Sequence, residues 1–164
     1  MIPGDAVAKF THMDDDGKAA MVDVGDKTVT RRRAVAEGEV RFNDEAFRAL
    51  RDNRLAKGDA IAVARLAGIQ ASKRTQEWIP LCHSVPLDHI AVDVELNDDR
   101  RSARVTAEAQ ARWTTGVEME ALVAVSAACL ALYDMAKAVD RGITIGGVRL
   151  LQKEGGRPGK WERE

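Results

Sequence analysis

The sequence predicts an α+β fold, in which helices cover one face of an antiparallel sheet. Two features carry this prediction. Residues 90–113 hold two runs of alternating apolar and polar residues around a polar turn, which is the pattern of a β-hairpin with one solvated face. From Ala121 to Tyr133 the chain is apolar apart from Ser126, which indicates a buried helix too short to span a membrane.

A first strand is expected before the hairpin. The stretch KTVTRRRAVAEGEV, residues 27–40, gathers β-branched residues, and Gly38 is expected to stop the strand. The stretch NDEAFRALRDN then predicts a short helix with Asn43 or Asp44 as its N-cap.

A longer helix is expected in KGDAIAVARLAGIQASKRTQEW, residues 57–78. Asp59 can cap this helix, and Pro80 ends it. Small residues recur along it at helical spacing, so that another helix or a sheet can approach that face closely. These residues are Ala60, Ala64, Gly68 and Ala71.

The longest helix is expected in TTGVEMEALVAVSAACLALYDMAKAVDRG. Thr115 and Glu118 have the spacing of a capping box at its start. Lys137 and Arg141 suit the negative C-terminal end of the helix, and Gly142 is expected to stop it.

A last strand is expected in ITIGGVRLLQK, ahead of the Gly-rich tail EGGRPGKWERE. If the two early helices form one crossover, the order is β-α-β-β-α-β, which is the ferredoxin-like arrangement. We expect a single domain over residues 1–164, with mobile segments at residues 1–20 and 154–164. The apolar and small-residue faces of the helices exceed what one sheet covers, so an oligomer is expected.

The composition is that of an ordinary soluble protein, with 164 residues, 45% hydrophobic, 31% charged and a net charge of −1. This charge gives no general reason to expect nucleic acid as a partner. The N-terminus lacks the apolar region of a secretory signal, and the only cysteines are Cys82 and Cys129. These features predict a cytoplasmic protein without a membrane partner.

Asp134 and Lys137 interrupt the apolar helix three residues apart, on one face. Such a pair is either an ion pair at a helix end or a proton donor and acceptor. The apolar neighbours Leu130, Tyr133 and Val139 suggest partial burial, which favours the second interpretation.

The motif PLCH places Cys82 beside His83. A zinc site needs three or four ligands, and the only other histidines are His12 and His89, so no metal site is expected. A histidine that hydrogen-bonds a substrate and a structural histidine in a tight turn both remain open at this point.

Basic residues recur at scattered positions, and a phosphate-rich ligand would explain them without making the whole protein basic. They are Arg31, Arg32, Arg33, Lys57, Lys73, Arg74, Arg157 and Lys160. No P-loop is present. In GVEME, Glu118 suits simple capping, whereas Glu120 could grip the adjacent N–H donors of a guanine-like ring.

Four stretches carry a more specific signal. They are THMDDDGKAAMVDVGDKTVTRRRAVAEG, KGDAIAVARLAGIQASKRTQEWIPLCH, TTGVEMEALVAVSAACLALYDMAKAVDRG and GGVRLLQKEGGRPG. Together they resemble the cyclic pyranopterin monophosphate synthase family, the accessory protein C (MoaC) family of molybdenum-cofactor biosynthesis. The resemblance runs from about Thr11 to Gly159.

The resemblance implies a ferredoxin-like subunit in a homohexamer, a trimer of dimers with active sites between subunits. It implies a lyase whose substrate is the cyclised dihydro-GTP made by an upstream radical S-adenosylmethionine enzyme. Its products would be cyclic pyranopterin monophosphate and pyrophosphate. No cofactor is implied, and assistance by Mg²⁺ is left open.

The resemblance also assigns roles by position. The family's catalytic residues match Asp134, Lys137 and Lys57. Its substrate-binding residues match Leu81, Cys82, His83, Glu118, Met119, Glu120, Arg32, Lys73 and Arg74, with Arg157 in the tail. Two departures stand out, because Ser84 replaces a usual Pro and Arg157-Pro158 replaces the usual Lys-Ser.

Two alternatives remain. A non-catalytic anion- or RNA-binding module on the same scaffold would place basic and aromatic residues together on the sheet, yet the chain has only seven aromatic residues and none on the solvated face of the hairpin. A zinc hydrolase would be built on Cys82, His83 and His89.

Overall fold

The computed structural model describes residues 18–156 and 159–164. The expected N-terminal segment, residues 1–20, lies outside the described residues except for its last three positions. Arg157 and Pro158 lie outside them as well.

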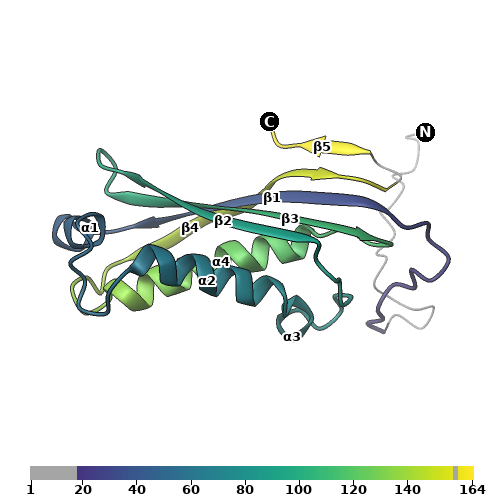
Figure 1. Cartoon of the computed structure of the whole chain (residues 1–164), viewed down its shortest axis with the longest axis horizontal. Coiled ribbons are helices and arrows are strands. Elements are labelled where there is room, and N and C mark those ends of the chain that lie inside the picture. The colour runs from purple at the N-terminus through teal and green to yellow at the C-terminus, as the bar shows by residue number, and fades with distance from the viewer. Residues whose placement is uncertain (1–17, 157–158) are drawn as a thin grey trace, which may run out of the picture.

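One antiparallel sheet forms the upper layer of the molecule in Figure 1. Its strands follow the order β2-β3-β1-β4-β5 and are β1 (Thr30–Arg41), β2 (His89–Asn97), β3 (Ser102–Trp113), β4 (Thr144–Glu154) and β5 (Lys160–Glu162). The order of the first four strands is that of the ferredoxin-like arrangement, so the predicted fold class is confirmed.

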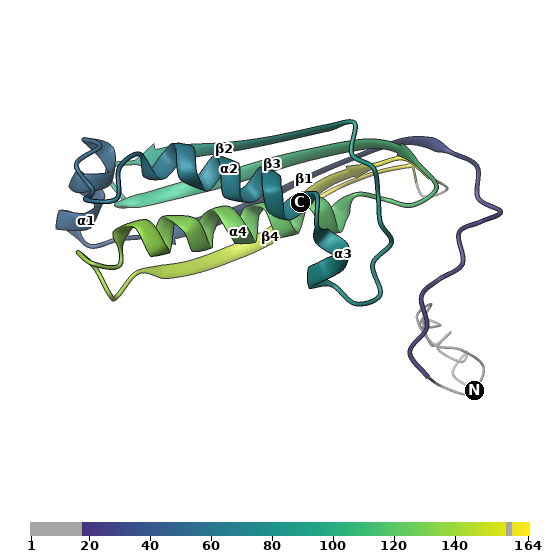
Figure 2. The same cartoon turned by 60° about the horizontal axis from the view of Figure 1, so that its bottom comes forward.

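Helices cover one face of this sheet. They are α1 (Asp44–Arg51), α2 (Ala60–Ser72), α3 (Thr75–Trp78) and α4 (Glu118–Ala136). Figures 1 and 2 show α2 and α4 side by side beneath the sheet, with α1 at one end and α3 near the other. The crossover between β1 and β2 therefore packs on the sheet through α2, and α1 is a separate helix at the end of the sheet.

Small side chains bring the two layers close together. The inward residues of β3 are nearly all alanine, and α4 buries a stripe of alanine and valine against them. A Cβ atom on Gly68 of α2 would lie 2.8 Å from the carbonyl oxygen of Ala124 in α4. The predicted small-residue face of α2 is thus its contact with α4, since Ala60, Ala64, Gly68 and Ala71 are all buried.

Gly38 does not stop β1, contrary to the expectation. The strand continues to Arg41, and a Cβ atom on Gly38 would lie 2.8 Å from Cγ1 of Val125 and 3.4 Å from Sγ of Cys129. Glycine is needed here because α4 crosses β1 closely, and this requirement is tertiary, so the strand pattern alone could not reveal it.

The caps of the early helices are confirmed. The side chain of Asn43 accepts a hydrogen bond from the backbone N–H of Ala46 at 2.8 Å, and Asp59 accepts one from Ala62 at 2.9 Å. The single helix expected up to Trp78 is instead broken after Ser72.

The break after Ser72 has a local cause. The Ser72 hydroxyl donates to the carbonyl oxygen of Ile69, and the buried Thr75 hydroxyl donates to the carbonyl oxygen of Ser72. These side chains satisfy backbone groups at the helix end, which is how serine and threonine compete with a continuing helix.

Both ends of α4 differ from the expectation. Its N-cap is Val117, without a side-chain hydrogen bond, so Thr115 and Glu118 do not form a capping box. The helix ends at Ala136, before Gly142, because the buried Asp140 accepts hydrogen bonds from the backbone N–H groups of Asn43 (2.7 Å) and Gly142 (2.8 Å). These bonds hold the chain after the helix against the start of α1.

The Gly-rich tail contains β5, a strand that the sequence pattern did not predict. Gly155 and Gly156 have positive φ angles of 103° and 77°. They turn the chain so that β5 pairs with the end of β4.

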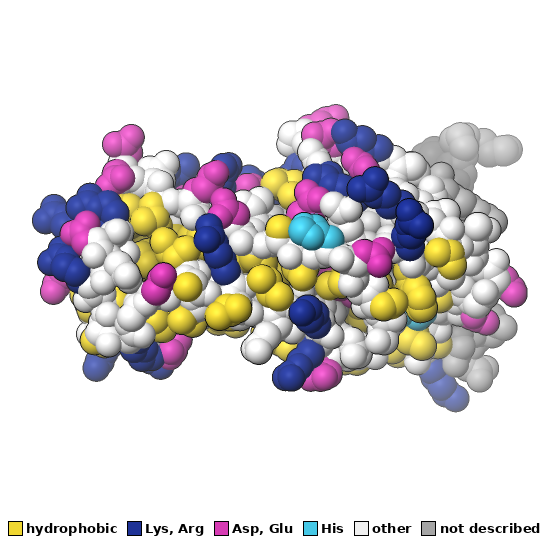
Figure 3. Space-filling model, viewed as in Figure 1, with side chains coloured by type: hydrophobic (Ala, Val, Ile, Leu, Met, Phe, Trp, Pro, Cys, Tyr) yellow, Lys and Arg dark blue, Asp and Glu magenta, His cyan; other side chains and the backbone are white. Residues whose placement is uncertain are grey.

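The helical layer leaves large apolar side chains in solvent. Leu66 of α2 and Leu130 of α4 are 63% and 53% exposed. Figure 3 shows hydrophobic side chains spread along the side of the molecule that α2 occupies. By length and hydropathy α4 could also cross a membrane, but it packs on the sheet and on α2, which is the setting of a core helix.

Candidate functional site

The first cluster lies at the C-terminal end of α4. Asp134 and Lys137 sit there one turn apart, and Lys57 reaches them from the loop between α1 and α2. The Asp134 carboxylate lies 2.8 Å from Nζ of Lys137 and 2.6 Å from Nζ of Lys57. The Lys57 ammonium also donates to the backbone carbonyl of Asp134 at 2.9 Å, so that it clamps the helix end.

Two ammonium groups keep Asp134 ionised. Hydrogen bonds from Lys137 and then Lys57 lower the pKa of Asp134 to about 2, and the same ion pair raises the pKa of Lys137. All three side chains are about half exposed, so the expected partial burial of the pair is wrong for the isolated chain. The neighbours Leu130 and Val139 are themselves exposed.

The second cluster lies at the opposite end of α4, around Glu120. This side chain is 1% exposed, and its Oε2 atom has no hydrogen-bond partner among the described residues. Burial, with a smaller contribution from the charge of Glu118, raises the pKa of Glu120 to about 7. A carboxyl group in this state can change its protonation near neutral pH and has an acceptor atom to spare.

Cys82 and His83 belong to this second cluster. Burial and the neighbouring charge of Glu120 raise the pKa of the Cys82 thiol, so it is a poor nucleophile. Nε2 of His83 lies 2.7 Å from the carbonyl oxygen of Val22, which ties the N-terminal segment to this turn. Leu81 and Met119, which precede Cys82 and Glu120 in the sequence, are half-buried.

Metal-binding arrangements are absent from the described part of the chain, since no group of three or more His, Cys, Asp and Glu side chains could hold an ion. Cys82 and Cys129 are both free thiols.

A pocket of about 760 Å³ opens beside the start of α4. Arg32 and Glu118 line it, and Arg32 donates hydrogen bonds to the carbonyl oxygens of Trp113 (3.2 Å) and Thr114 (3.1 Å). Lys153 of β4 lines the same pocket and pairs with the Glu118 carboxylate.

Sequence reasoning missed Lys153 because its partner lies 35 residues away, on another element. Only the strand alternation in ITIGGVRLLQK could have placed it on the same face of the sheet as Arg32.

Lys73 and Arg74 are exposed at the end of α2, and their side chains make no hydrogen bond or ion pair with any residue in 18–156 or 159–164. The structure therefore does not join them to either cluster. Arg157, the remaining substrate-binding expectation, lies outside the described residues.

Apart from Lys73, Arg74 and Arg157, the predicted site residues thus form two clusters, one at each end of α4. Glu120 and Asp134 belong to the same helix, fourteen residues apart, which corresponds to roughly 21 Å at 1.5 Å per residue. One chain therefore presents a carboxylate between two ammonium groups at one end and, at the other, a buried carboxyl group with one oxygen that has no partner among the described residues.

Comparison with known proteins gives consistent matches. The model of the MoaC family matches residues 21–156. A protein of Thermomicrobium roseum is 51% identical over 158 residues, which covers 96% of this chain and 95% of the relative. Proteins of Brucella ovis and Brucella abortus are each 52% identical over 153 residues, covering 93% of both chains. All three relatives are named cyclic pyranopterin monophosphate synthase.

Proposed function

Because this chain belongs to the MoaC family, we propose that it is a cyclic pyranopterin monophosphate synthase, a lyase of molybdenum-cofactor biosynthesis. Its substrate would be the cyclised dihydro-GTP made by a radical S-adenosylmethionine enzyme, and its products cyclic pyranopterin monophosphate and pyrophosphate. The observation that carries the proposal is the Asp134 carboxylate held between Lys57 and Lys137, because acid–base chemistry beside a triphosphate needs these groups together.

Cationic side chains would bind the triphosphate of the substrate. Forming a cyclic phosphate from a triphosphate breaks one phosphoanhydride bond, and negative charge grows on the departing pyrophosphate. Lys57 and Arg32 would stabilise this charge, and the exposed Lys73 and Arg74, which have no partner in the described chain, would complete the phosphate site.

Phosphate binding would also activate Asp134. With a pKa of about 2 in the unliganded chain, its carboxylate is a weak base. Phosphate oxygens that draw Lys57 away would remove one of the two ammonium groups beside Asp134, so its pKa would rise and its basicity would increase. Lys137 would then exchange the proton with Asp134 as the rings of the substrate open and reclose.

The second cluster would hold the base. The Oε2 atom of Glu120 has no partner in the described part of the chain and can accept a hydrogen bond from a ring N–H group, and its burial makes that hydrogen bond strong. His83 and Met119 would complete the contacts on this side, with Glu118 and the Leu81-Cys82 turn.

The separation of the clusters supports an active site shared between subunits. A compact nucleotide cannot touch Glu120 and Asp134 of one helix across roughly 21 Å. We therefore propose a homohexamer, a trimer of dimers, in which one subunit provides Lys57, Asp134 and Lys137 and a partner provides the base-binding end.

The direct test is incubation of the purified protein with the cyclised dihydro-GTP, with release of pyrophosphate and appearance of pterin fluorescence as the two readouts. Both signals should rise together without added cofactor. Parallel assays with Mg²⁺ and with a chelator decide whether the ion assists. A protein that binds the substrate but releases no pyrophosphate under either condition would instead be the non-catalytic anion-binding module.

The structure gives the RNA-binding alternative little support. Stacking of bases requires aromatic side chains on the sheet, and in the described strands the only ones are Trp113 and Trp161. Trp113 is the last residue of β3, and Trp161 lies in the short strand β5 near the end of the chain. We propose a cytoplasmic location for the enzyme, since its substrate is a small-molecule metabolite that another enzyme of the pathway supplies.

A further inference from the structure

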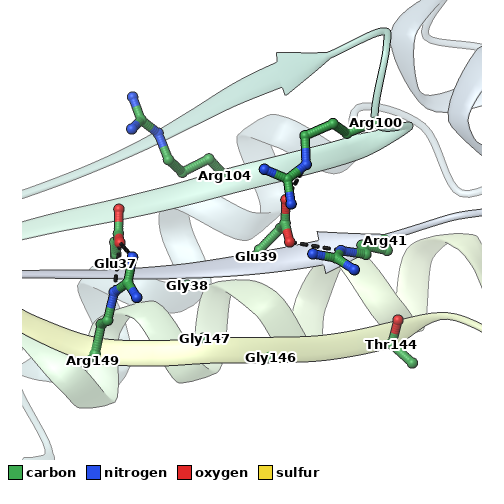
Figure 4. Close-up of a pocket in the computed structure, with 10 residues that line it drawn as sticks. All are labelled: Glu37, Gly38, Glu39, Arg41, Arg100, Arg104, Thr144, Gly146, Gly147 and Arg149. Atoms are coloured by element: carbon green, nitrogen blue, oxygen red, sulfur yellow. Dashed lines mark hydrogen bonds and ion pairs between the residues drawn. The ribbon is translucent and has the colours of Figure 1, made fainter.

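The open face of the sheet contains a pocket of about 720 Å³ that shares no residue with the two clusters (Figure 4). Its position follows from strand alternation. Gly38 faces α4, so its neighbours Glu37 and Glu39 point to the opposite face, away from the helices. Four arginines and two glutamates line this pocket, and one of the arginines, Arg104, is paired with Glu95.

An irregularity between β1 and β4 hollows the floor of the pocket. Glu37 pairs with Arg149 and Glu39 with Gly146, so two residues of β4 stand opposite Gly38. This is a β-bulge, and Gly147 within it has a φ of 64°. A Cβ atom on Gly146 or Gly147 would meet nothing within 4 Å, so the missing side chains leave open space between two ion pairs.

The arginines keep unused donors around this space. The Glu39 carboxylate accepts a hydrogen bond from Nε of Arg41 at 2.7 Å and faces Nε of Arg100 at 3.7 Å. One carboxylate between two guanidinium groups leaves a positive charge uncompensated. Within the described residues, the Nη atoms of Arg41 and Arg100 donate no hydrogen bond. Across the hollow, Arg149 donates from Nε and Nη2 to Glu37, and its Nη1 has no hydrogen-bond partner among the described residues (Figure 4).

We propose that this pocket binds a small multivalent phosphate anion at a site separate from the candidate active site. Guanidinium groups match phosphate oxygens with pairs of N–H donors, and the glycine floor lets the ligand reach them. The same chemistry is offered by free pyrophosphate and by the phosphate tail of a nucleotide, so both serve as probes.

The test is calorimetric titration of the full chain with inorganic pyrophosphate and, separately, with GTP. All proteins carry Lys57→Ala and Lys73→Ala, two exposed positions, to weaken phosphate binding at the candidate active site. Adding Arg41→Ala and Arg100→Ala should weaken pyrophosphate binding at least about tenfold, as loss of charge-assisted hydrogen bonds predicts. If the site accepts nucleotide tails, GTP binding falls in parallel; if it takes only the free anion, GTP binding is unchanged.

A matched control exists in the same chain. Arg51 and Arg54 also share one carboxylate, Asp52, although Arg51 is paired with Asp98 as well, and the hollow beside Arg51 has no glycine among its described lining residues. Arg51→Ala with Arg54→Ala should therefore leave pyrophosphate binding unchanged. Equal losses in both double variants would mean that only net charge matters, and the proposed site would be wrong.

A second pair of variants probes the hollow itself. Gly146→Glu places a carboxylate where open space lies and should abolish binding, whereas Gly146→Ala should preserve it. When either substitution is made in a chain that keeps Lys57 and Lys73, synthase turnover at low pyrophosphate should not change. This measurement separates the proposed anion site from the proposed function. Pyrophosphate binding that survives Gly146→Glu overturns the proposal. A change in oligomer size without a change in binding also overturns it, because this face would then be a contact between copies of the chain.

Discussion

At the scale of single residues, the structure assigns different electrostatic states to the two carboxyl groups that matter most. Asp134 is exposed and stays ionised because two lysines flank it. Glu120 is buried, its Oε2 atom has no partner within residues 18–156 and 159–164, and burial raises its pKa to about 7. The spacing of Asp134 and Lys137 had suggested a pair already poised for proton exchange, but in the unliganded chain both groups are firmly charged.

We predict that Asp134→Asn and Lys137→Ala each reduce turnover at least about a hundredfold, the usual scale for loss of acid–base catalysis. Both side chains are about half exposed, so folding should be preserved. Turnover and the thermal midpoint should be measured on the same preparations, with Glu45→Gln on the exposed start of α1 as a control. Near-normal turnover in either variant would make that residue an ion-pair partner at a helix end and nothing more.

Glu120 should make the stability of the protein depend on pH. Its carboxyl group loses its proton near pH 4.5 when unfolded and near pH 7 when folded. The folded chain therefore holds a proton that the unfolded chain lacks between these values, and the free energy of unfolding falls as pH rises through them. Each pKa unit corresponds to about 1.4 kcal/mol, so the loss amounts to about 3 kcal/mol by pH 8.

Glu120→Gln removes this charge and keeps the shape of the side chain. We predict that the variant matches the parent protein at pH 4 and is more stable at pH 8, by up to about 3 kcal/mol. Urea denaturation at the two pH values measures both quantities. If the parent and the variant show the same dependence on pH, the Glu120 carboxyl group is not desolvated in solution.

The candidate site was predictable where neighbours in sequence are neighbours in space. Spacing alone identified Asp134 with Lys137, and it raised Glu120 as more than a helix cap. Lys57 stood among the scattered basic residues, but only the resemblance gave it a catalytic role beside Asp134, because its contact with Asp134 spans 77 positions. Lys153 was not found for the same reason. The exposure of Asp134 and Lys137 was not foreseen either, because no local pattern indicates how exposed a side chain at a helix end is.

At the scale of elements, the periodic segments were predicted well and their ends were not. Alternation identified β2 and β3, and apolar content identified α4, since both signals report which side faces the core. The continuation of β1 through Gly38, the break after Ser72 and the end of α4 before Asp140 depend on contacts with other elements. Glycine, serine and aspartate satisfy those contacts, so their local preferences point to the wrong boundaries.

Gly68 offers a test of close packing between α2 and α4. In an exposed helix, replacing glycine by alanine stabilises by about 1 kcal/mol. Here a Cβ atom would lie 2.8 Å from the carbonyl oxygen of Ala124 and 3.0 Å from a methyl group of Val92. We therefore predict that Gly68→Ala destabilises the fold by about 1–3 kcal/mol, the usual cost of overpacking a core.

The measurement is the free energy of unfolding in urea, with Gly146→Ala as the control. Gly146 has open space around its Cβ position, so its alanine variant should change stability far less. A stabilised Gly68→Ala protein would show that α2 and α4 lie farther apart in solution.

At the scale of the whole molecule, the helical layer and the divided site point to assembly. Leu66 and Leu130 are exposed on α2 and α4, and burying such side chains stabilises an interface by about 1.5–3 kcal/mol each. We expect sedimentation to show a hexamer at micromolar concentration. A stable monomer that turns over substrate would contradict both the assembly and the shared site.

The strongest consequence of a shared site is complementation between two inactive proteins. Asp134→Asn removes the catalytic end of a subunit, and Glu120→Ala removes the base-binding end of a subunit, so each homo-oligomer should be inactive. When the two chains are mixed, unfolded and reassembled together, some interfaces join an intact Asp134 to an intact Glu120. Random assembly at two-fold interfaces should restore about a quarter of the sites, and turnover should recover to about that fraction.

The control is a mixture of Asp134→Asn with Lys137→Ala. These residues form one ion pair within one subunit, so reassembly cannot place both intact residues in the same site, and turnover should stay at the level of the separate variants. Recovery in the first mixture and none in the second would show that the two ends of α4 meet across subunits. Absence of recovery in both, with hybrid oligomers confirmed by mass, would contradict the shared site, because each chain would then complete its own site despite the separation of Glu120 and Asp134 along α4.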